Sequence, residues 1–496
     1  MRVRRLSLVS LATLLLLGGC MVGPNYHRPA AIVPTHYKEL SGWVVAQPQE
    51  SINRGAWWSV FNDPVLDSLE RQVNVSNQTV RADVAAYFQA RALVDEARAG
   101  LYPTLSANAG VTRQSSSRGS LSGGGTTAAF SAEPVTATNY TLEGTGAWDL
   151  DLWGAIRRQV QANVAAAQVS AADLAEAELS EQAALASDYF QLRAADADEK
   201  LLQDTVAAFR RTLVITQNQY AAGVAARSDV LAALVQVQNA QVSAIAAGVA
   251  RAEFEHAIAV LIGKPPADLT IPPGTLASNV PVVPAGIPST LLERRPDIAA
   301  AERTMDEENA LIGVQVAAYY PVVDLSAVFG YVGNPVGSLI QLSNRIWSLG
   351  ANATESLFQG GERSAAVAAA AAAYDESVAN YRNTVLTAFQ GVEDQLSSLR
   401  ILAEEYQAQQ AAVASATEEV TITLNEYEAG TQAYTAVVVA QTTQLADQES
   451  LLTVQQNRLL ASVSLIEDLG GGWSANELPT ANALQQSNPL IPNLPN

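Results

Sequence analysis

The hydrophobic pattern changes period several times along the chain, and each change predicts a new element. A helical period covers residues 65–99, and it opens at Asp63-Pro64, where Asp is a good N-cap and Pro suits the first turn. From residue 104 to about 113, apolar and polar residues alternate, which is typical of a half-buried strand. The alternation returns over residues 137–152, and two further strands are predicted at 322–332 and 345–358.

The predicted strand at 137–152 separates apolar side chains from acidic ones. Tyr140 and Trp148 share one face, whereas Glu143, Asp149 and Asp151 share the other. This pattern suits the wall of a membrane barrel, with lipid on one side and a water-filled lumen on the other. We therefore expect all three acids to line a lumen, and we prefer this to a catalytic pair formed by Asp149 and Asp151. The predicted lipid-facing residues are Tyr140, Trp148 and, in the fourth strand, Trp347.

Two very long helical regions follow the strand pairs, and each is interrupted once. The interruptions read Tyr220-Ala-Ala-Gly223 and Tyr427-Glu-Ala-Gly430, and they lie about two hundred residues apart, the scale of an internal duplication. Gly adopts positive φ without steric cost, so it suits the residue after a helix C-terminus. A helix of ~65 residues would be a rod of roughly 100 Å, which turns back at each Gly.

The chain therefore divides into two repeats, each made of a helix, two strands and a long helical hairpin. The first hairpin is predicted to turn at 220–229 and the second at 427–436. The predicted units are residues 1–19, a signal peptide; 20–63, an extended N-terminal segment; 64–264, the first repeat; 265–288, a proline-rich linker; 289–469, the second repeat; and 470–496, a C-terminal tail.

The N-terminus combines a basic start, a short apolar run and small residues, as a secretory signal does. It ends in Leu17-Gly18-Gly19-Cys20, and Cys20 is the only cysteine in the chain. This resembles a bacterial lipobox, which implies cleavage before Cys20 and its modification by diacylglycerol and an N-acyl group. Met21 is not the Asp that favours retention in the inner membrane, so the outer membrane is the expected location. The alternative is a cysteine placed there by chance.

Four strands cannot close a membrane barrel, because at least eight are needed. The strands must then be pooled between copies of the chain. Two copies would give a barrel filled by side chains, whereas three would give twelve strands and an open lumen. The alternative is that the chain is an entirely helical coiled-coil protein, which the alternation at 137–152 disfavours.

Charge and composition narrow the function classes. The chain of 496 residues has a net charge of −20 and only 16% charged residues, which argues against a nucleic-acid partner. The three histidines share no metal-ligand spacing, and the sequence has no phosphate loop or nucleophile elbow. We expect no catalytic residues, no metal and no cofactor apart from the covalent lipid on Cys20.

Several motifs together resemble the outer-membrane efflux protein family (TolC/OprM-like), especially its NodT-like lipoprotein branch. The likeness covers nearly the whole chain past Cys20. The motifs are the lipobox, Leu101-Tyr102-Pro103 with Tyr319-Tyr320-Pro321, Arg294-Arg295-Pro296-Asp297 and the two Tyr-x-x-Gly turns. The resemblance implies a homotrimer with an outer-membrane β-barrel and a long periplasmic α-barrel. It also implies a periplasmic adaptor and an inner-membrane pump of the resistance-nodulation-division type as partners, and export of drugs or other toxic compounds.

The same resemblance implies that the helical tips close the periplasmic end. The candidate gate residues are Tyr220, Gly223, Arg227, Asp229, Tyr427, Gly430, Gln432 and Thr435. Asp229 follows Gly223 by six residues, but Ala436 holds the matching place after Gly430, so the second tip lacks the acid. The alternative is that Arg227 and Asp229 only cap and solvate a turn. Two other functions stay open: the channel of a type I protein secretion system, and a non-conducting periplasmic adaptor or structural lipoprotein.

Overall fold

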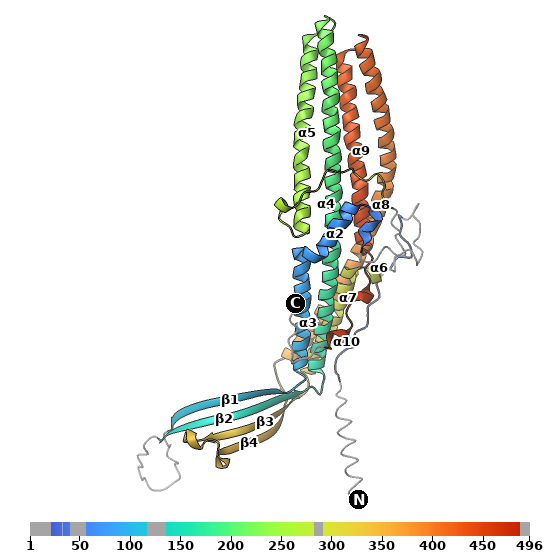
Figure 1. Ribbon diagram of the computed structural model, residues 1–496. Helices are drawn as coiled ribbons and strands as arrows, with labels where there is room; N and C mark the ends of the chain where they lie inside the picture. The colour runs from blue at the N-terminus through green and yellow to red at the C-terminus, as the bar shows by residue number, and fades with distance from the viewer. Residues whose placement is uncertain (1–20, 32, 40–55, 117–134, 282–290, 487–496) are drawn as a thin grey trace, which may run out of the picture.

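Two long helical hairpins stand side by side, and a four-stranded sheet projects from the opposite end of the molecule (Figure 1). The first hairpin consists of α4 (Ala155–Ala221) and α5 (Arg227–Leu261), and the second of α8 (Glu362–Glu428) and α9 (Tyr434–Asp468). Both first helices have 67 residues and both returning helices have 35. The computed structural model describes residues 21–31, 33–39, 56–116, 135–281 and 291–486.

The remaining elements complete two matching halves. A helix of 22 residues precedes each strand pair, α3 (Gln78–Ala99) in the first half and α7 (Pro296–Ala317) in the second. The strands are β1 (Thr104–Ser116), β2 (Val135–Leu150), β3 (Val322–Gly333) and β4 (Arg345–Thr354). The shorter elements are η1 (Trp57–Phe61), α2 (Pro64–Ser76), η2 (Pro266–Asp268), α6 (Leu291–Arg294), η4 (Val336–Ser338), η5 (Leu342–Asn344), η6 (Ala475–Glu477) and α10 (Ala481–Leu484).

The helix expected over residues 65–99 is broken at Asn77, which corrects the prediction of one continuous helix. Asp63 caps α2 as expected, since its carboxylate accepts the Val65 N–H at 2.9 Å. Asn77 has an extended backbone, and its side-chain oxygen caps α3 by accepting the Thr79 N–H at 2.8 Å. The Asn77 amide also donates to the Leu261 carbonyl at 2.9 Å. A tertiary contact with the end of α5 therefore fixes the break.

Two strands end earlier than the sequence pattern predicted. β2 stops at Leu150 rather than 152, because the Asp151 side chain turns back to the start of α4. β4 stops at Thr354 rather than 358, because the Glu355 carboxylate pairs with Arg363 of α8 at 2.6 Å. Leu357 and Phe358, the apolar residues that extended the predicted strand, lie in the irregular connection and are exposed.

The sheet is antiparallel, with the strand order β1-β2-β3-β4. Within the described chain, β1 and β4 are edge strands, each paired along one side only. An edge strand leaves a row of backbone N–H and C=O groups available for another strand. The order also joins the two halves, because β2 of the first half pairs with β3 of the second.

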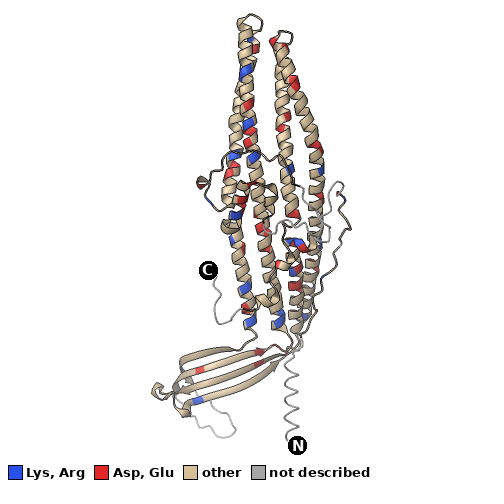
Figure 2. Ribbon diagram, turned by 45° about the vertical axis from the view of Figure 1, so that its right-hand side comes forward, with Lys and Arg blue, Asp and Glu red and all other residues tan. Residues whose placement is uncertain are grey.

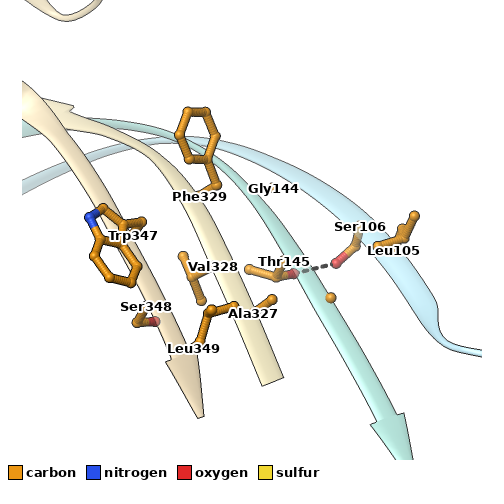
Figure 3. A pocket seen from close by; sticks show the side chains of 11 residues that line it. Leu105, Ser106, Gly144, Thr145, Ala327, Val328, Phe329, Trp347, Ser348 and Leu349 are labelled. Carbon is orange, nitrogen blue, oxygen red and sulfur yellow. Dashed lines mark hydrogen bonds between the residues drawn. The ribbon is translucent and has the colours of Figure 1, made fainter. Parts of the chain in front are cut away.

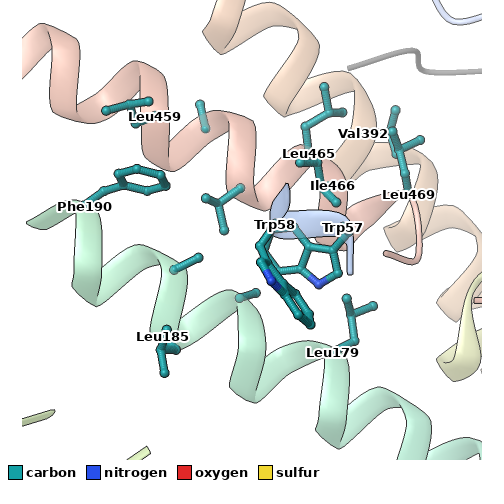
Figure 4. Packing of buried hydrophobic residues seen from close by; sticks show 14 of the residues in the cluster. Trp57, Trp58, Leu179, Leu185, Phe190, Val392, Leu459, Leu465, Ile466 and Leu469 are labelled. Atoms are coloured by element: carbon teal, nitrogen blue, oxygen red, sulfur yellow. The ribbon is translucent and has the colours of Figure 1, made fainter. Parts of the chain in front are cut away.

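The main core lies midway along the helices, away from the sheet. Trp57 and Trp58 of η1 are 1% and 4% exposed and lie between α4 and α9, among Leu179, Leu465 and neighbouring aliphatic residues (Figure 4). The Trp57 indole N–H donates to Gln182 at 3.0 Å, so the buried polar atom has a partner. This core holds the two hairpins together at their base and leaves the far ends as slender helix pairs.

Candidate functional site: the helical tips and the faces of the sheet

Both hairpins turn with the same backbone geometry. Gly223 and Gly430 have φ of +77° and +71°, and open space surrounds the position where a Cβ would lie. The N–H of the next residue reaches back to the helix in each case, from Val224 to the Gln219 carbonyl at 2.9 Å and from Thr431 to the Glu426 carbonyl at 3.0 Å. This is the Schellman pattern. Glycine is needed here for its positive φ and not for lack of space.

The first tip presents its side chains to solvent. Tyr220 is 47% exposed, and Arg227, at the first position of α5, is also exposed. The Asp229 carboxylate accepts the Ala226 N–H at 3.3 Å, so it caps α5 from the third position of the helix. Arg227 forms no ion pair with any residue that the structure describes. Arg227 and Asp229 are close in sequence, but their side chains do not form an ion pair.

The second tip is built differently, around a residue that the sequence analysis did not select. Tyr434 holds the first position of α9, which corresponds to Arg227 in α5, but it is only 4% exposed. Its ring lies 5.5 Å from that of Tyr427, and both pack in one cluster with Ala233 of α5. Burial, Tyr427 and Asp229 raise the pKa of Tyr434 to about 12. The two phenols therefore stay neutral across the physiological pH range.

Amide side chains add hydrogen bonds between the two hairpins near the tips. The Gln219 amide of α4 donates to the Tyr427 carbonyl of α8 at 2.8 Å. Further down, the buried Gln441 amide of α9 donates to the Thr212 hydroxyl of α4 at 3.0 Å. The predicted residues Gln432 and Thr435 are exposed instead. Near the tips, the contacts between the hairpins thus combine these amide hydrogen bonds with the apolar cluster around Tyr427 and Tyr434, and the sequence signal for them was the pair of tyrosines flanking Gly430.

The sheet has one apolar face and one polar face, and strand pairing extends this division across all four strands. Trp148 lies opposite Leu325, which lies opposite Ala351. The apolar face carries Leu105, Ala107, Ala109, Val111, Tyr140, Leu142, Trp148, Leu150, Val323, Leu325, Ala327, Phe329, Tyr331, Trp347, Leu349, Ala351 and Ala353. The other face carries mostly Ser, Thr, Asn and acidic residues. Large apolar side chains that are exposed over a whole face indicate contact with lipid or another chain.

The structure places most of the predicted wall residues as the alternation indicated. Tyr140, Trp148 and Trp347 lie on the apolar face, and Glu143 and Asp149 lie on the polar face. Asp149 has an acidic neighbour, Asp324, directly opposite in β3. The sequence analysis did not select Asp324, although its place in an alternating strand was a usable signal.

Asp151 is not a wall residue, so its predicted place in the lumen is corrected. It follows the end of β2, and its carboxylate accepts the N–H groups of Ile156 and Arg157 at 3.1 and 3.0 Å. The same carboxylate pairs with the Arg157 guanidinium at 2.9 Å and is only 8% exposed. A carboxylate at a helix N-terminus is stabilised by the free N–H groups of the first turn. Asp151 therefore fixes the junction between the sheet and α4.

The N-terminal segment docks at this same junction. The Val22 N–H donates to the Trp153 carbonyl at 3.0 Å, and the Arg158 guanidinium donates to the carbonyls of Val22 and Gly23 at 3.0 and 3.2 Å. A Cβ at Gly154, where φ is +85°, would lie 2.6 Å from the Met21 side chain. Cys20 itself lies outside the described residues. The described chain nevertheless begins at the boundary between the strands and the long helices.

A second polar cluster joins the start of α7 and the end of α9 to the side of α4 in the middle of the molecule. Arg295 donates to both oxygens of Asp297 and to the carbonyl of Asp468, the last at 2.7 Å. Glu176 of α4 and Glu467 of α9 lie beside this ion-pair group. Burial, with a smaller contribution from neighbouring carboxylates, raises the pKa of each of these two glutamates to about 7, although Arg295 opposes the shift.

The described residues contain no group of three or more His, Cys, Asp and Glu side chains that could hold a metal ion. The candidate site is a set of surfaces, namely the tips, the two faces of the sheet and the docked N-terminal segment. Such an arrangement defines a membrane protein whose sheet separates lipid from water.

The chain belongs to the outer membrane efflux protein family, whose model matches residues 69–264 and 287–471. The probable efflux pump outer membrane protein TtgC of Pseudomonas putida is 29% identical over 98% of this chain and 99% of its own. The outer membrane protein OprJ of Pseudomonas aeruginosa is 28% identical over 95% of this chain and 97% of its own. The protein is accordingly an outer-membrane channel component of an efflux system.

Solved structures agree with this assignment. The outer-membrane channel OprN superposes with a TM-score of 0.83 at 27% identity, covering 92% of this chain and all of its own. The open MtrE channel of Neisseria gonorrhoeae gives 0.78 at 25% identity, covering 92% and 99%. The predicted fold class, a mainly helical chain of two repeats that contributes four strands to a membrane barrel, is confirmed.

Proposed function

We propose that the protein is the passive exit duct of a tripartite efflux pump and carries small toxic compounds from the periplasm to the exterior. The observation that carries this is the sheet, which has one apolar face, one polar face and two unpaired edges. A sheet of this kind is stable in a membrane only as part of a closed barrel. The duct itself needs no energy source, since the pump supplies it.

Three copies of the chain would close the barrel with twelve strands. In that arrangement β1 of one protomer pairs with β4 of its neighbour, which satisfies both edges. The polar face of the sheet would then line the lumen of the trimer. Two copies would give only eight strands, whose interior would be too narrow for a duct. The apolar surface of α5 supports lateral packing of the hairpins in the same assembly, because Leu231, Val235, Val242, Ile245 and Val249 are all exposed.

Among the described helices, α5 alone is long and apolar enough to cross a membrane, judged by length and composition.

The class of cargo is proposed from the relatives. Their names refer to toluene and solvent efflux, antibiotic efflux and pyoverdine export. We assign drugs and other small toxic compounds to this chain, with the helical tips meeting a periplasmic adaptor that links the duct to an inner-membrane pump of the resistance-nodulation-division type. Cross-linking from positions beside Gly223 and Gly430 tests this docking, and the absence of any adduct with the adaptor would contradict it.

The anchor is proposed to be a lipid on Cys20. Docking of Met21 and Val22 at the junction between strands and helices supports it, since the preceding residue then joins the chain at membrane level. The barrel is the second anchor, and it adds to the membrane affinity of the acyl chains on Cys20. Labelling with radioactive palmitate should mark the wild type and leave Cys20→Ala unlabelled; equal labelling of both would refute the assignment.

The gate is proposed to lie at the tips, with unequal contributions from the two hairpins. Asp229 caps its own helix and leaves Arg227 free to contact another protomer. Tyr427 and Tyr434 tie the second hairpin to the first within the chain. Asp229→Ala should raise the conductance of the reconstituted trimer, and an unchanged conductance and closed fraction would count against its role.

The experiment that tests the function as a whole is reconstitution in planar lipid bilayers. The purified protein should insert as a trimer and conduct ions. Deletion of the gene should raise the accumulation of antibiotics and dyes in the cell, and complementation should restore the low level. A monomer that never inserts would exclude the duct and favour a structural role in the periplasm. Conduction with unchanged drug accumulation in the deletion strain would instead favour protein secretion.

A further inference from the structure

Charged residues on the sheet are separated by sign between its two faces. The polar face carries only acids, Glu143, Asp149 and Asp324. The apolar face carries only two charged residues, and both are arginines, Arg113 of β1 and Arg345 of β4. Few charges of any kind occur on the sheet (Figure 2). A cation on an otherwise apolar face is costly unless an anion or water meets it, so the position of the two arginines is informative.

Both arginines lie at the end of the sheet far from the helices. Arg345 opens β4, whose other end leads to α8, and Arg113 lies near the end of β1. On each strand, the stretch from the arginine to the last apolar residue beside the helices, Ala353 or Leu105, spans ~27 Å at about 3.4 Å per residue. A strand tilt of about 40° reduces this to a height of roughly 20 Å, close to the ~25 Å apolar band of membrane barrels. The arginines therefore lie at the outer boundary of the lipid.

Neither arginine side chain forms an ion pair with another residue of the described chain. Both side chains are exposed. Tyr331 lies directly opposite Arg345 on the same face, and Tyr140 lies on β2 one pair away from Arg113. A tyrosine beside each arginine is the arrangement expected where a lipid headgroup meets the hydrocarbon. Each guanidinium keeps its donors free for a ligand from the membrane.

An apolar hollow begins at Trp347, two residues along β4 from Arg345. It has a volume of about 630 Å³, large enough for part of an acyl chain. Its walls include Leu105, Phe329, Trp347 and Leu349, and its floor is formed by small residues such as Gly144 (Figure 3). These wall residues are 57% to 85% exposed, so no part of the described chain covers them. Trp347 lies two residues from Arg345 on the same strand and face.

We propose that Arg345 and Tyr331, with the hollow beside them, bind a phosphate-bearing lipid of the outer leaflet. The guanidinium would bind the phosphate through paired N–H donors, and an acyl chain would lie along Trp347 and Leu349. The inference rests on the proposed function, since it requires the sheet to be part of a membrane barrel. In the closed trimer β1 adjoins the neighbour's β4, so Arg113 of one protomer and Arg345 of the next share one rim and add to the same anionic site.

The test measures binding of lipid A to the detergent-solubilised full-length protein by native mass spectrometry. Diphosphorylated lipid A is compared with dephosphorylated lipid A, which separates the phosphate contribution from that of the acyl chains. The wild type should prefer the phosphorylated form. Arg345→Gln should lower that preference about fivefold, the effect of removing ~1 kcal/mol for one cation at a charged lipid surface. The variant with both Arg113→Gln and Arg345→Gln should lose it.

Two further variants separate the parts of the site. Arg210→Gln removes an exposed arginine of α4 and should leave lipid binding unchanged. Gly144→Val fills the hollow from its floor, where an added Cβ meets only ordinary contacts of 3.8 and 3.9 Å. It should weaken binding of both lipid forms alike. An equal preference in the wild type and the double variant would overturn the proposal.

Conductance of the same preparations keeps the two hypotheses distinguishable. A wild type that conducts but binds both lipid forms equally overturns the lipid site and leaves the duct intact. A wild type that binds phosphorylated lipid but never conducts overturns the duct and supports the lipid-facing assignment of the apolar face.

Discussion

The buried glutamates at the helix junction predict that the helical body becomes less stable as pH rises. Glu176 and Glu467 have folded-state pKa values of about 7, against an ordinary value of 4.5, chiefly because burial disfavours the charged form. The folded protein therefore binds protons more tightly than the unfolded chain between these two pH values. Stability from this source is fully present below the unfolded pKa and is lost as pH rises through the folded one.

The size of the effect follows from the shift. A difference of about 2.5 pH units corresponds to ~3 kcal/mol for one carboxyl group. The groups that face the pair are Arg295, Asp297 and Asp468, with Asp173 near Glu176. The Glu176 carboxylate raises the pKa of Glu467, so neutralising Glu176 also relieves Glu467. We expect Glu176→Gln to remove more than half of the pair's pH dependence, and the variant with Glu467→Gln as well to remove nearly all of it.

The assay is urea denaturation of the detergent-solubilised protein, followed by far-ultraviolet circular dichroism at about pH 5 and about pH 8. The comparison is the difference between each variant and the wild type. Glu70, which is also buried with a raised pKa, is present in all of them and cancels. Glu418→Gln, on an exposed position of α8, is the matched control and should behave as the wild type. A double variant that loses as much stability with rising pH as the wild type would refute the reasoning.

Three further predictions concern the tips and the membrane junction. Tyr434→Ala removes a buried ring packed against Tyr427 and should cost ~3 kcal/mol locally. The reconstituted channel should then open more often, whereas Tyr434→Phe should not change it; equal open fractions for Tyr434→Ala and wild type would contradict a role of Tyr434 in holding the tips closed. Asp151→Ala removes the cap of α4 and should cost ~2 kcal/mol in urea denaturation; a loss within error of zero would show that the cap is dispensable. Gly154→Ala places a methyl group at φ +85° against Met21 and should speed proteolysis of the N-terminal segment; an unchanged cleavage rate would argue against close docking.

Local features of the chain could be predicted because they depend on residues near one another in sequence. The change from a helical to an alternating period located the four strands, and strand alternation alone placed Tyr140 and Glu143 on opposite faces. The two Gly turns were found for the same reason, since positive φ is a property of the residue itself. The resemblance of both halves to one family pattern then led to the membrane barrel and its function.

Features that depend on contacts between distant segments appeared only in the tertiary structure. Asn77 breaks a helix because the end of α5 lies against it, and Asp151 leaves the wall because the first turn of α4 offers free N–H groups. Tyr434 is buried because the first hairpin packs over it, whereas Arg227, at the equivalent position of α5, faces solvent. The sequence alone determined the repeat, the strand faces and the turns, since each follows from local periodicity. Burial of the first residue of α9, but not of its counterpart in α5, was decided by packing between the hairpins, which no local pattern encodes.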